Sequence, residues 1–124
     1  MPLLRETTVA HFSLLLTQNP FACQSFDSAL QFAKAALAAG YSIEQVFLYE
    51  DAVFAAAATI DLPTDERNLA AELAKFCQQQ QLPLLYCITA AEKRGVQAAN
   101  DSLFQAAGLA EFAMRLANSK LVQF

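Results

Sequence analysis

The chain alternates between short apolar runs and longer segments in which apolar residues recur at helical spacing. His11–Thr17, HFSLLLT, is an apolar run of strand length, and a turn-prone Gln-Asn-Pro sequence follows it. Similar runs occur at Val46–Tyr49, Leu84–Ile88 and Leu121–Phe124. Buried parallel strands form continuous apolar runs of this kind, so we expect each of these segments to be a strand.

Two of the longer segments have clear helical signals. Apolar residues recur every three or four positions over Gln24–Ala39, and Gly40 follows as a helix stop. A second helix is expected to begin with Thr64 or Asp65 as its cap and to run to about Gln80.

The remaining segments are shorter or mixed in pattern. Ala52–Leu62 favours a short helix or a loop, because its alanines favour a helix and the proline that follows breaks one. Thr89 is expected to cap a turn or helix that starts near Ala90. Leu103–Asn118 has the pattern of a helix bent near Gly108.

Strands that alternate with helices predict a parallel sheet covered on both faces. Parallel neighbours need crossover connections, which are right-handed and usually helical. The expected fold is therefore one α/β domain over residues 1–124, built as a three-layer sandwich. In such open sheets the functional crevice lies outside the carboxyl ends of the strands, and Cys87 lies near one such end.

Composition adds an expectation about partners. Hydrophobic residues make up 56% of the chain and charged residues only 16%, which suggests surface that is buried against other subunits. The net charge of −4 and a pI near 4.8 provide no basic stripe for phosphates. We therefore expect protein partners rather than direct contact with nucleic acid.

The location expected from the sequence is the cytoplasm. No apolar run approaches the ~18 residues of a membrane-spanning helix, and the first residues do not resemble a secretory leader. The three cysteines are odd in number and irregular in spacing, which is typical of reduced thiols rather than a disulfide framework.

The sequence has none of the familiar cofactor or metal signatures. A nucleotide-binding loop needs clustered glycines, but Gly40, Gly95 and Gly108 are far apart. His11 is the only histidine and is expected at the start of a strand, away from the carboxyl ends, where it is an ordinary strand residue. The sequence therefore predicts neither a cofactor nor a metal site.

Thiol chemistry at Cys87 is the candidate that remains. A thiol reacts as its thiolate, which is stabilised near a helix N-terminus or near cations. The turn that follows Cys87 could supply free backbone N–H groups, and Lys93 and Arg94 come soon after it. The alternative is that Cys87 is an inert buried cysteine, since cysteine is among the most buried residue types.

The other two cysteines have less distinctive positions. Cys77 lies on the core side of its expected helix and is predicted to be a small buried hydrophobe. Cys23 follows the first strand in a loop that would also lie at the carboxyl edge of the sheet. It is expected to be a loop residue, with a role as a secondary thiol left open.

Around Cys87 the chain has Leu84, Cys87 and Ala90, followed by Arg94-Gly95-Val96. These residues in this order resemble the TusD/DsrE family of sulfur-relay proteins. Ser28–Ala33, the Val46–Tyr49 run with Val53 beyond it, and the closing Val122–Phe124 also agree, so the resemblance extends from about Phe12 to the C-terminus.

The resemblance implies a fold, an activity and site residues. The implied fold is a three-layer α/β/α sandwich whose mainly parallel sheet has about five strands. In that family the matching cysteine accepts a sulfane sulfur as a persulfide and passes it to the next carrier protein, so this role falls on Cys87. Thr89, Lys93 and Arg94 are the expected supporting residues.

The resemblance also implies partners and pathways. Members like TusD assemble with two related smaller subunits and serve 2-thiolation of the wobble uridine in certain tRNAs. DsrE subunits serve dissimilatory sulfur oxidation instead. We therefore expect a sulfurtransferase without a cofactor, in a hetero-oligomer of related subunits, with donor and acceptor carrier proteins. The alternative is a structural or interaction subunit in which Cys87 is inert.

Overall fold

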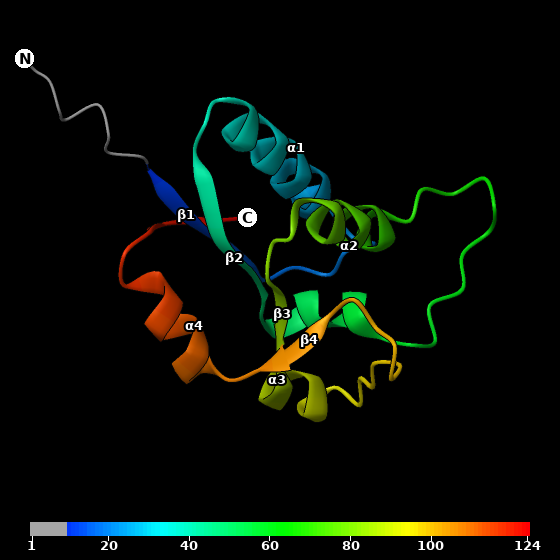
Figure 1. Ribbon diagram of the computed structural model, residues 1–124. Helices are drawn as coiled ribbons and strands as arrows, with labels where there is room; N and C mark the ends of the chain where they lie inside the picture. The colour runs from blue at the N-terminus through cyan, green and yellow to red at the C-terminus, as the bar shows by residue number, and fades with distance from the viewer. Residues whose placement is uncertain (1–9) are drawn as a thin grey trace, which may run out of the picture.

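A five-stranded parallel sheet forms the centre of the structure. The computed structural model describes residues 10–124, and the strand order is β4-β3-β2-β1-β5 (Figure 1). The strands are β1 (His11–Leu16), β2 (Ser42–Leu48), β3 (Leu84–Cys87), β4 (Gln105–Ala107) and β5 (Lys120–Gln123). Every neighbouring pair is parallel, so the predicted α/β class is confirmed.

Helices cover both faces of this sheet. Helices α1 (Ser25–Ala38) and α2 (Leu69–Gln80) lie over one face, and α3 (Ile88–Lys93) and α4 (Leu109–Leu116) lie over the other (Figure 1). The 3₁₀ helix η2 (Glu50–Ala56) follows β2 and contributes buried side chains to both apolar cores. This arrangement confirms the three-layer α/β/α sandwich.

Alternate side chains of the strands enter the two cores. In β2, Val46 and Leu48 pack with α1 and α2, whereas Phe47 belongs to the opposite core. The Phe47 ring lies 4.7 Å from the ring of Phe112 on α4, measured between centroids. Because successive side chains of a strand point to opposite faces, a continuous apolar run is required to fill both cores.

Two buried polar side chains connect the sheet to the C-terminal segment. Gln45 on β2 donates from Nε2 to Ser13 Oγ and to the Phe112 carbonyl oxygen, each at 3.1 Å. Ser13 Oγ also lies 2.6 Å from Ser119 Oγ. Strand β2 begins at Ser42 and not at the predicted Val46. The prediction missed its first half because the polar Gln45 interrupts the apolar run.

Helix α1 follows its predicted spacing closely. Phe26, Leu30 and Ala33 lie on its buried side. The chain turns after this helix at Gly40, whose φ of 88° is in the left-handed region that glycine adopts without steric cost. The N–H of Tyr41 donates to the Ala36 carbonyl oxygen at 2.9 Å and closes the helix end.

The predicted start of α2 was wrong by several residues. Thr64 and Asp65 lie in an exposed turn, and the helix begins at Leu69. Its cap is Asn68, whose Oδ1 accepts the N–H of Ala71 at 3.0 Å. The N–H groups in the first turn of a helix have no acceptor within the helix. The Asn68 oxygen supplies one, which favours a helix start at this residue.

The predicted helix over Leu103–Asn118 was wrong in its first half. Gln105–Ala107 forms strand β4, which pairs with β3, and α4 begins only after Gly108. This short segment has no strand pattern of its own. It becomes a strand because the free edge of β3 supplies hydrogen-bond partners, so tertiary pairing overrides the local helical preference.

The cap of α2 provides a test of this account. Replacing Asn68 by Ala removes the acceptor for the Ala71 N–H, and we expect the free energy of unfolding to fall by about 1 kcal/mol. Thr64→Ala, in the exposed turn, should change it by less than about 0.5 kcal/mol. Urea denaturation measures both variants, and equal losses would contradict the assignment of the cap.

Candidate functional site

Cys87 ends strand β3 and immediately precedes α3. Its backbone is extended, with φ of −69° and ψ of 118°, and its thiol makes no capping hydrogen bond to the helix. The residue is 2% exposed, so it is buried under the sandwich surface rather than displayed on it. Access to the thiol therefore depends on the space beside it.

A cavity of about 420 Å³ lies beside Cys87. This volume falls within the range of small-molecule sites in proteins. The cavity is lined by Tyr49, Glu50, Cys87, Thr89, Ala90, Lys93, Arg94 and Leu109.

The residues that line this cavity lie at or just after the ends of three neighbouring strands, β2, β3 and β4. Tyr49 follows β2, Cys87 ends β3, and Leu109 follows β4 by two residues. The carboxyl ends of parallel neighbours meet at one edge of a sheet, so these residues come together although they are distant in sequence. Thr89 and Lys93 are four residues apart on α3, which places both on one side of the helix.

The expected role of Thr89 as a helix cap was wrong. Helix α3 begins at Ile88, so Cys87 itself occupies the cap position and Thr89 is the second helical residue. Strand β3 ends one residue earlier than predicted for the same reason. Thr89 is exposed and lines the cavity, so it remains beside the thiol.

Arg94 connects α3 to η2. Its Nε donates to Asp51 Oδ1 at 2.8 Å, and its Nη1 donates to the carbonyl oxygen of Ala90 at 3.2 Å. The Arg94 side chain is 26% exposed and the Asp51 side chain is 57% exposed, so only the guanidinium is partly shielded from solvent. The positive charge of Arg94 is therefore already matched by a carboxylate at the wall of the cavity.

Lys93 differs from Arg94 in this respect. Within residues 10–124, no carboxylate oxygen lies within 4.0 Å of its ammonium nitrogen. Lys93 is exposed and lines the same cavity as Cys87. Its cationic charge is therefore available to an anion that enters.

Glu50 is the acidic residue in the lining of the cavity. Its φ of 48° lies in the left-handed region, which is uncommon for a residue with a side chain. Its neighbours are held on both sides, because the Tyr49 N–H donates to the Leu16 carbonyl oxygen at 2.9 Å and Asp51 binds Arg94. The backbone turn that brings Glu50 to the cavity is thus imposed by its surroundings.

Sequence reasoning missed the roles of Glu50 and Asp51. The pair was visible as acidic residues directly after a predicted strand, at the edge where a crevice was expected. Polar residues at that point are a usable signal for a site. The partner of Asp51 was not foreseeable, since Arg94 lies 43 residues further along the chain.

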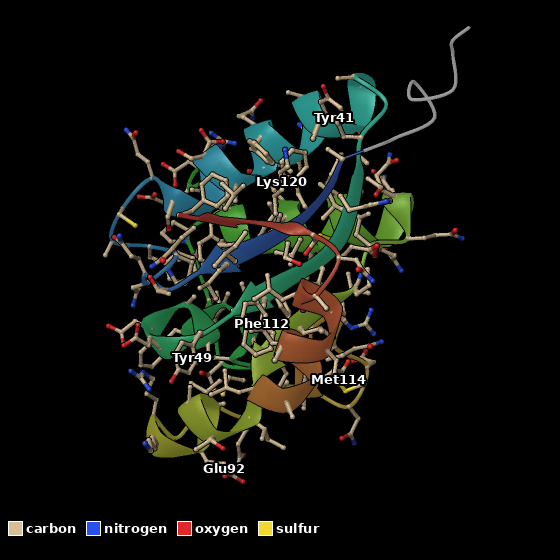
Figure 2. All side chains as sticks on the ribbon, turned by 90° about the vertical axis from the view of Figure 1, so that its left-hand side faces the viewer. Tyr41, Tyr49, Glu92, Phe112, Met114 and Lys120 are labelled. Carbon is tan, nitrogen blue, oxygen red and sulfur yellow. The ribbon has the colours of Figure 1, made fainter. Side chains whose placement is uncertain are left out.

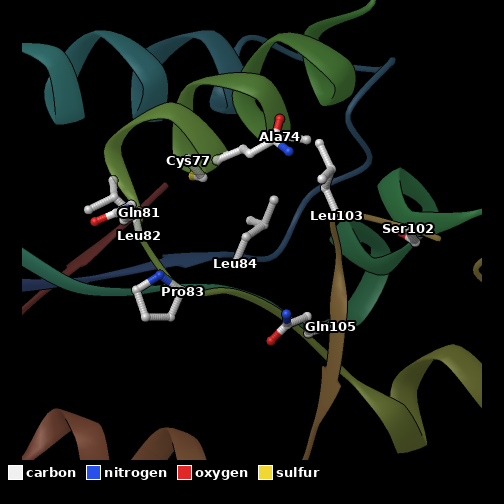
Figure 3. A pocket seen from close by; sticks show the side chains of 10 residues that line it. Ala74, Cys77, Gln81, Leu82, Pro83, Leu84, Ser102, Leu103 and Gln105 are labelled. Atoms are coloured by element: carbon white, nitrogen blue, oxygen red, sulfur yellow. The ribbon is translucent and has the colours of Figure 1, made fainter.

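Cys77 lies in a different environment, as predicted. It is buried on α2 and lines a second cavity, of about 200 Å³, with Leu84 at the opposite end of β3 from Cys87 (Figure 3). Desolvation by burial raises the pKa of the Cys77 thiol to about 12. Cys77 is therefore protonated and unreactive at neutral pH.

Cys23 is half-buried in the loop after β1. Its Sγ lies 3.2 Å from Ser25 Oγ and 3.7 Å from the carbonyl oxygen of Asn19. It lines a groove of about 630 Å³ with Phe21 and Pro63. Within the described chain, Cys23 is not part of the lining of the Cys87 cavity, so the structure does not bring these two thiols into one site.

His11, the single histidine of the sequence, is not among the residues that line the Cys87 cavity. His11 begins β1, at the amino-end edge of the sheet, and its ring contacts the Ser42 hydroxyl. Among residues 10–124, no group of three or more His, Cys, Asp or Glu side chains is arranged to hold a metal ion. None of the helices in this range is long and apolar enough to cross a membrane.

These features define an α/β/α protein with a cysteine at the carboxyl edge of a parallel sheet, beside a small cavity. Residues 10–124 match the DsrE/DsrF-like family. The chain belongs to this family.

Curated relatives carry sulfurtransferase names. The "Putative sulfurtransferase DsrE" of Allochromatium vinosum is 38% identical over 85 residues, which are 68% of this chain and 65% of that protein. Sulfurtransferase TusD of Cronobacter sakazakii is 36% identical over 94 residues, covering 76% and 73%. Sulfurtransferase TusD of Erwinia tasmaniensis is 34% identical over 126 residues, covering 91% and 98%. The chain thus spans just under two thirds of the first relative and nearly all of the third.

A solved structure supports the fold. The crystal structure of the YchN protein from E. coli superposes with a TM-score of 0.78, covering 94% of this chain and 100% of that chain. The sequence identity is 21%, so the likeness shows the shared fold alone.

The environments of the cysteines predict different reactivity in the native protein. With a pKa of about 12, Cys77 has roughly one thiolate per ten thousand molecules at pH 8, so iodoacetamide should leave it unmodified. Cys87 should be modified through its cavity. In denaturant, all three cysteines should react. Peptide mass spectrometry measures each site, and labelling of native Cys77 as fast as denatured Cys77 would contradict its burial.

Proposed function

We propose that this protein is a sulfurtransferase subunit of a sulfur relay in which Cys87 carries the sulfur as a persulfide. The observation that carries the proposal is the position of Cys87 at the carboxyl end of β3, beside a cavity that also contains Lys93 and Arg94. The sulfurtransferase names of the relatives support the same reaction class.

The proposed reaction has two exchange steps. The Cys87 thiolate attacks the outer sulfur of a donor persulfide, R–S–SH, and the donor leaves as R–S⁻ with the electron pair of the broken S–S bond. Cys87 then holds the sulfur as Cys87–S–SH. An acceptor thiolate attacks that outer sulfur in turn and releases the Cys87 thiolate. Like thiol–disulfide exchange, the rate depends on thiolate fraction, leaving group and access.

The surrounding residues support the anions in these steps. Lys93 is the proposed cation for the thiolate and persulfide, because its charge has no carboxylate within contact distance in the described chain. Arg94 holds α3 against η2 through Asp51 and adds a positive potential that is partly cancelled by this pairing. Thr89 lines the same cavity, and its side chain has a hydroxyl group that can donate a hydrogen bond.

The proposed destination of the sulfur is 2-thiolation of the wobble uridine in tRNA. The TusD names of the relatives that align over most of their length favour this pathway. The alternative is the role in sulfur oxidation that the resemblance to DsrE implies, and the relative from Allochromatium vinosum carries the DsrE name. We place either reaction in the cytoplasm, where thiols are kept reduced, and propose no cofactor.

Sulfur uptake by cysteine variants tests the proposal. Cys87→Ser should abolish incorporation of labelled sulfane sulfur, because serine cannot form a persulfide. Cys77→Ser and Cys23→Ser should retain it, since neither residue lines the Cys87 cavity. Mass spectrometry of the intact protein before and after treatment with a reductant measures the bound sulfur. Transfer that survives the Cys87→Ser change would refute the proposal.

A structural subunit with an inert Cys87 is the second candidate, and the 2% exposure of this residue favours it. Protection of native Cys87 from iodoacetamide would support that role. Selective modification of Cys87 would support the carrier.

We further propose that the protein assembles with related subunits through α4 and β5. No residue of α4 is buried, and Met114 on its outer side is 78% exposed (Figure 2). Leu121 on β5 is 48% exposed. Glu111 and Arg115 pair within the helix, so this surface has little unmatched charge and suits an apolar partner of the same fold. Leu109 joins it to the Cys87 cavity.

A charge placed on this surface tests the assembly. Met114→Glu should weaken association with copurifying subunits at least about tenfold, because a buried unpaired carboxylate is costly. Phe21→Glu is the matched control, since Phe21 is also exposed but lies in the loop after β1. Copurification from the native host with analytical ultracentrifugation measures both. Unchanged assembly of Met114→Glu would exclude α4 as the interface.

A further inference from the structure

The charges around the Cys87 cavity nearly cancel. The lining contains one acidic residue, Glu50, and two basic residues, Lys93 and Arg94. Arg94 is matched by Asp51 at 2.8 Å, which leaves one cation and one carboxylate facing the space. The cavity therefore has little net positive charge with which to attract anions in general, although the thiol beside it would react as a thiolate anion.

The fold imposes the backbone conformation that positions Glu50 at the cavity. Its left-handed backbone costs on the order of 1 kcal/mol for a residue other than glycine, and such strain persists only where surroundings enforce it. Here the enforcing contacts are the Tyr49 N–H on the Leu16 carbonyl oxygen and the buried Ala52 and Val53 of η2. A glycine would adopt this turn without strain but would carry no charge.

We propose that Glu50 is a specificity-determining residue that disfavours highly charged sulfur donors at Cys87. A carboxylate repels a dianion such as thiosulfate but not the neutral persulfide group of a donor R–S–SH, since Coulomb energy scales with the product of the charges. Without Glu50, Lys93 would favour the dianion. The inference rests on the proposed function, because it names the donor class that the same thiol accepts.

Both donors can deliver sulfur by balanced reactions. With thiosulfate, the Cys87 thiolate attacks the outer sulfur, the S–S bond breaks, and sulfite leaves with the electron pair, giving the Cys87 persulfide anion. With a persulfide R–S–SH, the leaving group is R–S⁻. The two reactions differ in the charge that must pass Glu50, so discrimination falls on approach to the cavity rather than on the bond that forms.

Alkylation measures this discrimination without any sulfur donor. Iodoacetate carries one negative charge and iodoacetamide carries none, while both attach to Cys87 sulfur and release iodide. In Glu50→Gln, we expect the ratio of the iodoacetate rate to the iodoacetamide rate at Cys87 to rise about three- to tenfold. Glu50→Asp, which retains the charge, should keep the wild-type ratio. Glu50→Gly should raise the ratio as Glu50→Gln does, although its backbone is relaxed.

A matched control separates local from overall charge. Glu92→Gln removes the same charge from an exposed residue of α3 that is not in the lining of the cavity, and its ratio should stay within about 1.5-fold of wild type. The donor assay should agree, with sulfur uptake from thiosulfate relative to cysteine persulfide rising at least about threefold in Glu50→Gln.

The outcomes separate the inference from the proposed function. An unchanged alkylation ratio in Glu50→Gln, or an equal rise in Glu92→Gln, overturns the role of Glu50 even if Cys87 carries sulfur. A wild-type protein that takes sulfur from neither donor overturns the proposed function, while its alkylation ratio still reports whether Glu50 selects by charge. A Cys87 that neither alkylating reagent modifies overturns both.

Discussion

Strand β3 is hydrogen-bonded along both edges, and the position of the candidate site depends on this pairing. Leu84 and Leu85 pair with Val46 and Phe47 of β2, and the far side of β3 pairs with β4, where Cys87 faces Ala107. The strand is only four residues long and passes directly into α3 without a loop. A thiol at such a junction is held by the sheet on one side and by the helix on the other.

The Arg94–Asp51 ion pair stabilises the wall of the cavity built on that junction. It joins α3, which follows Cys87, to η2, which follows β2, and so connects segments that meet only at the carboxyl edge of the sheet. It also neutralises the charge of Arg94, one of the two basic residues that line the cavity. Because the two opposite charges of the pair largely cancel, it adds little to the net potential of the site. Glu50 and Lys93 are the remaining charged residues of the cavity lining.

The two faces of the sandwich are covered unequally. Helices α1 and α2 bury a continuous core that includes Phe26 and Leu73, whereas α4 contacts the sheet through the half-buried Phe112 and leaves its other side open. The buried Gln45 holds this helix by donating to the Phe112 carbonyl oxygen. Exposed apolar residues of α4 therefore form part of the high apolar content of the chain. Leu109, the first residue of α4, also lines the Cys87 cavity.

Local patterns in the sequence determined the strands with continuous apolar runs, helix α1 and the position of Cys87 at the end of a strand, because apolar periodicity is read within a few residues. Strand β4, the start of α2 and the ion pair of Arg94 were decided only by the tertiary structure. Gln105–Ala107 is a strand because β3 offers it an edge, and the helix start at Asn68 depends on which side chain reaches a free N–H. The ion pair of Arg94 joins residues 43 positions apart. Contacts of this range depend on how the layers pack, and no local pattern encodes them.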